Sequence, residues 1–193
     1  MKRVLTAAIA ATALLLTGCA GSDDTEAAPA ASASGAAYPV TVGNVTLAQR
    51  PERIVSLSPT VTEMLFAIDA GPQVVAVDDQ STYPADAPRT DLSGFKPNAE
   101  AIAAKNPDLV VLSNDQDKIV DQLTALKIPA FLAPAAQSLD QTYTEIGQLG
   151  TLTGHQAEAG ALTERMKTQI DKIVQGVPKR TEPLSYYYEL DPT

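Results

Sequence analysis

Side chains that could perform catalysis are scarce in this sequence of 193 residues, which holds one cysteine, Cys19, and one histidine, His155. One cysteine cannot close an intrachain disulfide or build a thiolate zinc cluster, and one histidine cannot supply a multi-histidine metal site. The only histidine that could activate Ser58 lies on a separate predicted helix, and neither a glycine-rich phosphate loop nor a carboxylate pair is evident. These residues argue against an enzyme, a resident cofactor and a metal site.

Polar, turn-rich segments follow several apolar runs, and they are the better candidates for binding. They cover residues 56–59, 78–83, 91–95 and 113–115. If the runs are parallel strands, the segments meet at the carboxyl edge of one sheet, where such sheets bind their ligands. Every strand must also end in a loop, so on this pattern alone binding and simple connection are equally good interpretations.

The elements that would position these segments alternate between strand and helix. Apolar runs at 53–57, 74–77, 109–112 and 130–132 predict buried strands, and apolar stripes within 60–70, 98–105, 118–126 and 138–152 predict helices. A hairpin with Gly43 and Asn44 at its turn is predicted over 39–47. Short connections then predict an α/β fold over residues 38–153, a Rossmann-like parallel sheet lobe with helices on both faces.

The part that follows has a different pattern. Residues 154–178 run without an internal proline and carry Leu162, Met166 and Ile170 at helical spacing, which predicts one long helix. Residues 184–190 then predict a strand with no element after it. The composition fits a folded protein, with 45 % hydrophobic and 19 % charged residues, and the net charge of −9 argues against a nucleic-acid partner, which would call for a basic patch.

The first 37 residues predict a signal peptide followed by a linker. Two positive charges precede an apolar run at 4–16 that is too short to span a membrane, so residues 1–18 predict a signal peptide. Residues 16–19 resemble the bacterial lipobox, which implies lipid attachment at Cys19 and an extracytoplasmic protein anchored to the cell membrane. Residues 19–37 lack large apolar side chains before Tyr38 and predict a disordered linker. The alternative to the lipobox interpretation is a plain secretory signal in which the Cys19 thiol has no role.

Residues 53–68 resemble the opening strand and helix of the substrate-binding proteins of ABC importers that handle cobalamin, ferric siderophores and haem. Residues 74–77 with Tyr83-Pro84, then 97–102 and 107–111, match further segments of that family in order. In the family one long helix joins two α/β lobes, and the ligand lies between the lobes. The resemblance therefore implies that 154–178 is the interlobe helix and that 179–193 begins a second lobe, which we expect to be truncated.

The resemblance also assigns roles to single residues. Those expected to face the ligand are Ser58, Pro59, Tyr83, Phe95, Asn114 and Asp115. Exposed aromatic faces suit a large flat chelate, although Tyr83 and Phe95 could equally be packing residues of their loops. Glu100 matches the acid that docks onto an arginine of the permease, although the helix dipole alone would favour an acid there.

The function implied is that of a solute-binding lipoprotein. It would capture cobalamin, a ferric siderophore or haem and deliver it to an ABC permease and its ATPase. It would meet the membrane through its lipid anchor only, and it would have no nucleic-acid partner. The alternatives are a cell-surface signalling or adhesion lipoprotein built on the same lobe, or a non-functional truncated copy.

Overall fold

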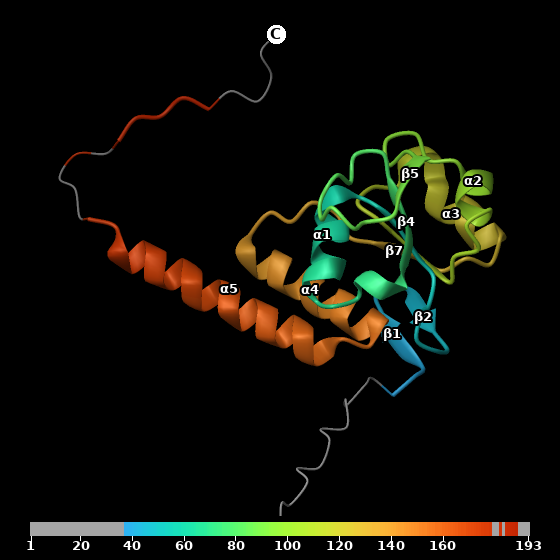
Figure 1. The fold of residues 1–193 in the computed structure, drawn as a ribbon, viewed down its shortest axis with the longest axis horizontal. Coiled ribbons are helices and arrows are strands. Elements are labelled where there is room, and N and C mark those ends of the chain that lie inside the picture. The colour runs from blue at the N-terminus through green and yellow to red at the C-terminus, as the bar shows by residue number, and fades with distance from the viewer. Residues whose placement is uncertain (1–36, 179–181, 183, 189–193) are drawn as a thin grey trace, which may run out of the picture. The chain divides into compact units, whose positions relative to one another are not determined.

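A five-stranded parallel sheet lies at the centre of the fold (Figure 1). The computed structural model describes residues 37–178, 182 and 184–188, so the predicted signal peptide, Cys19 and residues 20–36 of the linker lie outside the described residues. The strand order is β5-β4-β3-β6-β7. The strands are β3 (Ile54–Leu57), β4 (Val74–Asp78), β5 (Arg89–Leu92), β6 (Leu109–Leu112) and β7 (Ala130–Leu132).

Helices cover both faces of this sheet, as predicted. One face packs on α1 (Pro59–Ala67), α4 (Leu139–Thr153) and the start of α5 (Gln156–Gly176), and the other packs on α2 (Ala99–Ala103) and α3 (Ile119–Ala125). Two short 3₁₀ turns, η1 (Gly71–Gln73) and η2 (Gln116–Lys118), lead into β4 and α3. Successive residues of β3 point to opposite faces, with Ile54 in the first core and Val55 in the second.

An antiparallel hairpin precedes the sheet, formed by β1 (Val40–Val42) and β2 (Val45–Leu47). Its inward valines and Leu47 join the core beneath α4, while Thr41 and Thr46 face outward. Gly43 takes a left-handed φ of 57° at the turn, which the glycine-asparagine pair predicted.

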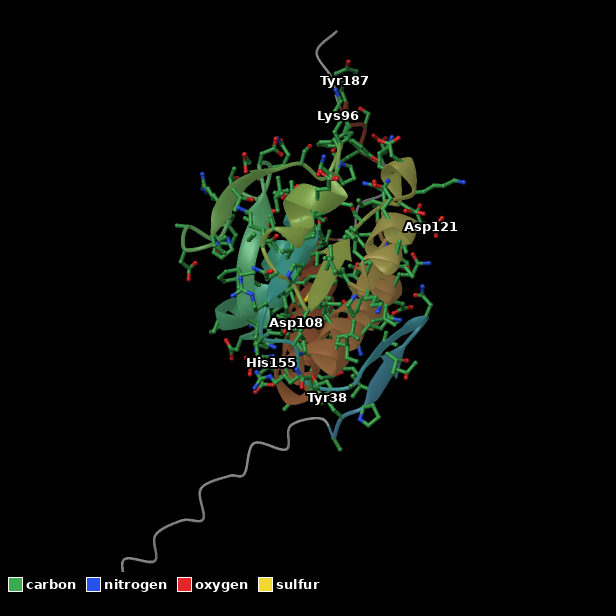
Figure 2. All side chains as sticks on the ribbon, turned by 90° about the vertical axis from the view of Figure 1, so that its right-hand side faces the viewer. Tyr38, Lys96, Asp108, Asp121, His155 and Tyr187 are labelled. Atoms are coloured by element: carbon green, nitrogen blue, oxygen red, sulfur yellow. The ribbon has the colours of Figure 1, made fainter. Side chains whose placement is uncertain are left out.

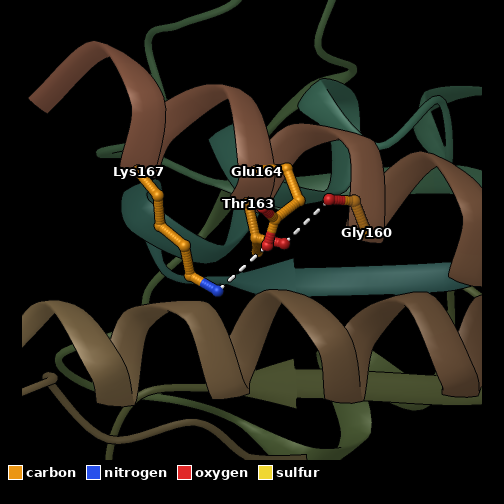
Figure 3. Close-up of polar contacts among 4 residues, drawn as sticks. All are labelled: Gly160, Thr163, Glu164 and Lys167. Carbon is orange, nitrogen blue, oxygen red and sulfur yellow. Dashed lines mark hydrogen bonds and ion pairs between the residues drawn. The ribbon is translucent and has the colours of Figure 1, made fainter. Parts of the chain in front are cut away.

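The long helix α5 follows α4 after Gly154, which ends α4 with a left-handed φ of 78°. Its first half packs on the core through Ala159, Leu162 and Met166, whereas residues 171–178 are all exposed. Figure 3 shows two contacts within α5: Lys167 Nζ lies 3.1 Å from Glu164 Oε1, and Thr163 Oγ1 donates to the Gly160 carbonyl at 2.9 Å. No helix among the described residues is long and apolar enough to cross a membrane.

Two predictions about the strands need correction. The sheet gains β5, which the sequence did not reveal because the residues Arg89-Thr90-Asp91-Leu92 lack an apolar run and form an exposed sheet edge. Conversely, residues 184–188 form no strand, since no strand of the described sheet pairs with them; residues 189–190 lie outside the described residues.

Candidate functional site

Two adjoining pockets lie at the carboxyl ends of the central strands. The first, here called the sheet-edge pocket, has a volume of about 280 Å³, and the second, the α1–α4 pocket, about 360 Å³. The sheet-edge pocket is lined by Leu57, Ser58, Pro59, Asp78, Gln80, Gly94, Phe95, Ser113 and Asn114. Ser58 and Ser113 line both pockets, so together they form one concave surface along the end of the sheet. This is where parallel α/β sheets bind ligands.

A larger hollow of about 530 Å³ lies beside the start of β4, next to η1, Asp69 and Asp86. It is at the opposite end of the strand from Asp78 and gathers few hydrogen-bonding groups other than these two acids. Volume alone therefore does not identify the site, and the carboxyl edge remains the better candidate because its polar groups converge there.

The structure brings four of the six predicted ligand-facing residues together. Ser58 and Pro59 form the junction of β3 and α1, and Phe95 and Asn114 complete the rim of the sheet-edge pocket. Phe95 is 71 % exposed, so its ring is available for contact. Figure 2 shows Lys96, the next residue, at one end of the lobe and Tyr38 and His155 toward the other.

The other predicted residues lie outside both pockets. Tyr83 is 66 % exposed on the segment after β4. Asp115 accepts a hydrogen bond from the Val120 amide at 2.9 Å, which gives it a structural task at the start of α3. Glu100 lies in the first turn of α2, exposed to solvent, where Asn98 caps the helix by accepting from the Ala101 amide at 2.8 Å.

Several pocket residues were not singled out from the sequence. Asp78 and Ser113 each begin a polar segment after a buried strand, and that position was the available signal. Gly94 lies so close to the strand ends that a β-carbon there would be 2.6 Å from the Leu57 carbonyl oxygen and 2.9 Å from Asp78 Oδ2. Glu145 reaches the α1–α4 pocket from the middle of α4, where the helical pattern gave no functional signal.

A buried row of polar side chains lies beneath the sheet-edge pocket. Asp78, Ser81, Thr62 and Ser56 are all at most 2 % exposed. Ser81 Oγ lies 2.5 Å from Asp78 Oδ1 and 2.9 Å from Thr62 Oγ1. Thr62 Oγ1 donates to Ser56 Oγ at 2.9 Å. Ser56 donates to the Ser58 carbonyl at 3.4 Å, so the row, here called the hydroxyl relay, joins β4 to the β3–α1 junction.

Burial also shapes the electrostatics of the two pockets. The pKa of Asp78 is raised, chiefly by its burial, with the negative charge of Asp79 adding to the rise and the hydrogen bonds from Ser81 opposing it. Partial burial raises the pKa of Glu145 in the α1–α4 pocket. Within the described residues, no group of three histidine, cysteine, aspartate or glutamate side chains is placed to hold a metal ion.

Comparison with known proteins agrees with this fold. A family model described as "Periplasmic binding protein" matches residues 54–193, which is most of the chain, and the chain belongs to that family. The chain is similar to a cobalamin-binding protein of Halobacterium salinarum, with 33 % identity over 151 residues, covering 75 % of this chain and 41 % of the relative. It is also similar to YvrC of Bacillus subtilis, an uncharacterized ABC transporter substrate-binding lipoprotein, with 29 % identity over 96 % of this chain and 63 % of the relative.

Solved structures give the same result. The periplasmic haem-binding protein HutB of Vibrio cholerae superimposes with a TM-score of 0.61 at 27 % identity, covering 66 % of this chain and 51 % of HutB. HutB is described as periplasmic and YvrC as a lipoprotein, and the family is one of solute-binding proteins, which are not enzymes. The chain spans less than two thirds of the length of each of them.

Proposed function

We propose that this protein is an extracytoplasmic solute-binding lipoprotein that captures a metal chelate and delivers it to an ABC permease and its ATPase. The observation that carries this proposal is the concave carboxyl edge, where Ser58, Pro59, Phe95 and Asn114 converge in a chain of this family. Cobalamin, a ferric siderophore or haem is the ligand class we favour, because relatives are named for cobalamin and for haem.

The chemistry of the edge supports a large, flat and partly apolar ligand. The exposed ring of Phe95 offers a face for stacking, and Tyr83, outside both pockets, is a second exposed aromatic side chain. The hydroxyl of Ser58 and the amide of Asn114 can hydrogen-bond to the periphery of such a ligand.

A thermal-shift panel tests ligand capture. Cyanocobalamin, haem and a ferric siderophore are each added to the full chain, and a ligand that binds the folded state raises its melting temperature. Phe95→Ala should abolish the shift, whereas Phe66→Ala, on the far end of α1 beside Gly71, should lower the melting temperature but keep the shift. No shift with any of the three ligands contradicts the proposed ligand class.

We propose that Glu100 makes the contact with the permease. The Asn98 cap orders the backbone of the first turn of α2, and the Glu100 side chain is exposed outside both pockets, where its carboxylate can pair with an arginine of a partner. In cells, Glu100→Gln should abolish uptake and leave ligand binding intact. Glu63→Gln, an exposed acid on α1, is the matched control. Unchanged uptake in the Glu100 variant excludes this docking contact.

We also propose that Cys19 carries a lipid. Its position after residues 16–18 of the lipobox-like segment supports this modification. Mass spectrometry of the membrane fraction should find the acylated cysteine, and Cys19→Ala should release the protein from the membrane. A Cys19→Ala variant that stays in the membrane fraction contradicts the anchor.

A further inference from the structure

The side of α4 that faces the core carries one acid. Leu149 and Leu152 are fully buried on that side, and Thr142 and Glu145 continue the same line at helical spacing toward the start of the helix. Both of these polar residues line the α1–α4 pocket, and Glu145 is half-buried there. An apolar residue would suit this side of the helix better, because burying a charge is unfavourable. A residue that breaks the pattern of its element in this way is typical of a functional site.

Glu145 has no polar partner within the described part of the chain. Its carboxylate takes part in no hydrogen bond there, and the ion pair of the described residues joins Lys167 to Glu164 instead. Asp78, the acid of the sheet-edge pocket, differs in this respect, because the amide and the hydroxyl of Ser81 both donate to its Oδ1. The Glu145 carboxylate is therefore available to a ligand.

The rest of the α1–α4 pocket is uncharged. Val61 and Met64 form an apolar wall on α1, and residues 133–136 add only alanine and proline side chains. The Thr142 hydroxyl donates to the Ser138 carbonyl at 3.3 Å, so its oxygen can still accept a hydrogen bond. Among the described residues, no lysine, arginine or histidine lines this pocket or the sheet-edge pocket. Apolar walls with one carboxylate match an alkyl chain that ends in a cation.

We propose that the α1–α4 pocket binds a ligand arm that ends in an ammonium group, and that Glu145 sets this specificity by pairing with the ammonium. This inference rests on the proposed function and names the ligand chemistry at that site. The volume of about 360 Å³ lies near the lower end of the range for ligand sites, roughly 300–1,000 Å³, which suits one arm of a chelate. Ser58 and Ser113 line both pockets, so a chelate over the sheet-edge pocket can extend an arm into its neighbour.

Other ligand groups match this pocket less well. An anionic arm, such as a haem propionate, would meet the like charge of Glu145 with no lining cation to offset it. A carboxamide can donate to the carboxylate, but it lacks the charge that strengthens such a bond. A bare metal ion needs several ligands, and no group of three suitable side chains is placed to hold one among the described residues. An ammonium group supplies both the opposite charge and three hydrogens.

Two forms of one ferric chelate test the arm by calorimetry. Ferrioxamine B carries a pendant pentylammonium arm, and N-acetylation makes that arm neutral without changing the metal-binding groups. The full chain should bind ferrioxamine B about tenfold more tightly than the acetylated form, which is the gain from one charge-assisted hydrogen bond. Equal affinities, or tighter binding of the acetylated form, overturn the proposal.

Glu145→Gln tests the residue, because it keeps the shape of the side chain and removes its charge. It should reduce the affinity for ferrioxamine B to that for the acetylated form and leave the latter unchanged. Asp140→Asn, which removes an exposed acid from the same helix, is the matched control and should keep the preference for the ammonium form. A preference that survives in Glu145→Gln, or that disappears equally in Asp140→Asn, overturns the assignment to Glu145.

The melting temperatures of the same variants separate a binding role from a structural one. Glu145→Gln breaks no described contact, so its melting temperature should equal or exceed that of the unmodified chain. Asp140 lies in the first turn of α4, where the helix dipole stabilises an acid, and Asp140→Asn should lower the melting temperature by about 2 °C. A larger decrease in Glu145→Gln than in Asp140→Asn would make Glu145 a structural residue and overturn the proposal.

Pentylammonium chloride separates this inference from the proposed function. Carbon-13 NMR of the full chain follows the Glu145 carboxyl signal, which is identified by its absence from the Glu145→Gln spectrum. The signal should move to saturation with pentylammonium and stay fixed with 1-pentanol or sodium chloride. If it moves while no chelate binds, the ammonium site is supported and the proposed function is contradicted. If a chelate binds while the signal stays fixed, the proposed function is supported and the ammonium site is overturned.

Discussion

Polar side chains are used differently at the amino and carboxyl edges of the sheet, that is, at the two ends of its strands. At the amino edge, polar side chains are committed to distant backbone groups. Asp108 accepts from the amides of Glu52 and Arg53 at 2.8 and 2.9 Å, and Arg53 donates to the Lys105 carbonyl at 2.7 Å. Tyr38 donates to the Leu152 carbonyl at 3.0 Å, which fixes the hairpin to the end of α4.

The carboxyl edge leaves its polar groups available. Among the described residues, the side chains of Gln80 and Ser113 form no hydrogen bond, and Asn114 bonds only to the nearby Gln116 amide at 3.2 Å. The buried relay behind them is fully connected. The difference shows how one sheet divides its tasks: one edge holds the chain together, and the other presents groups to a ligand on a rigid support.

The largest effect should come from the corner between α4 and α5, on the amino-edge side. A β-carbon on Gly150 would lie 2.5 Å from Ala159 Cβ and 3.0 Å from the His155 carbonyl oxygen. Gly150→Ala must therefore push the two helices apart, and we expect it to lower the free energy of unfolding by roughly 3 kcal/mol. Urea denaturation measures this loss.

Gly147→Ala is the matched control, one turn earlier on the same helix. A β-carbon there meets nothing within 4 Å, so the better helix former should raise the free energy of unfolding by up to about 1 kcal/mol. If both variants change stability in the same direction, close packing at this corner is not what stabilises it.

A smaller loss is expected at Asp108. Asp108→Ala leaves the Glu52 and Arg53 amides without their carboxylate acceptor, and we expect a decrease of about 2 kcal/mol in the free energy of unfolding. Asp86→Ala removes an exposed acid from the edge of the large hollow and should change stability by less than about 0.5 kcal/mol. If both substitutions change the free energy of unfolding equally, the hydrogen bonds of Asp108 do not stabilise the fold.

The two edges should also respond to pH with opposite sign. Burial, followed by the neighbouring Arg50, lowers the pKa of His155, whose Nε2 lies 2.9 Å from Arg50 Nη2. As the pH falls below about 6.5, the unfolded chain takes up a proton before the folded one, so the free energy of unfolding falls. Asp78 does the reverse. Its pKa is raised, so as the pH rises above about 3.9 the unfolded chain ionises first, and stability falls toward higher pH.

Urea denaturation at a series of pH values upward from about 3.9 and downward from about 6.5, the ordinary values of the two groups, separates the two contributions. His155→Gln should reduce the loss of stability on the acidic side, and Asp78→Asn should reduce the loss toward neutral pH. Profiles that change in the same direction in both variants contradict the assigned pKa directions.

The sequence predicted most of this architecture because its signals are local. Each pattern can be recognised within one short segment: the apolar stripes of α1, α4 and α5, and the apolar runs of β3, β4 and β6. The edge strand β5 was missed because an exposed strand needs no apolar run; Leu92 is its one buried residue.

The site was predicted only in part, for a related reason. Ser58 and Asn114 follow predicted strands, so their meeting at one end of the sheet could be derived from topology, whereas Phe95 follows the missed strand β5 and was expected there from the family resemblance. The hydroxyl relay beside Asp78 could not, since Ser81, Thr62 and Ser56 come from three different segments and meet only in the folded chain. Chemistry that arises from such long-range contacts leaves no periodic signal in the sequence.

The smallest effect on stability is expected at Ser113, although it lies at the centre of the site. It is half-buried and lines both pockets, so Ser113→Ala should change the free energy of unfolding by less than about 0.5 kcal/mol while it weakens the binding of cyanocobalamin. Ser138→Ala is the counterpart away from the site. Ser138 caps α4 by accepting from the Gln141 amide at 3.3 Å, and its loss should cost about 1 kcal/mol and leave binding unchanged. Calorimetry and urea denaturation are carried out on both variants. If Ser113→Ala lowers stability and keeps the affinity for cyanocobalamin, the carboxyl edge has a structural role like that of the amino edge.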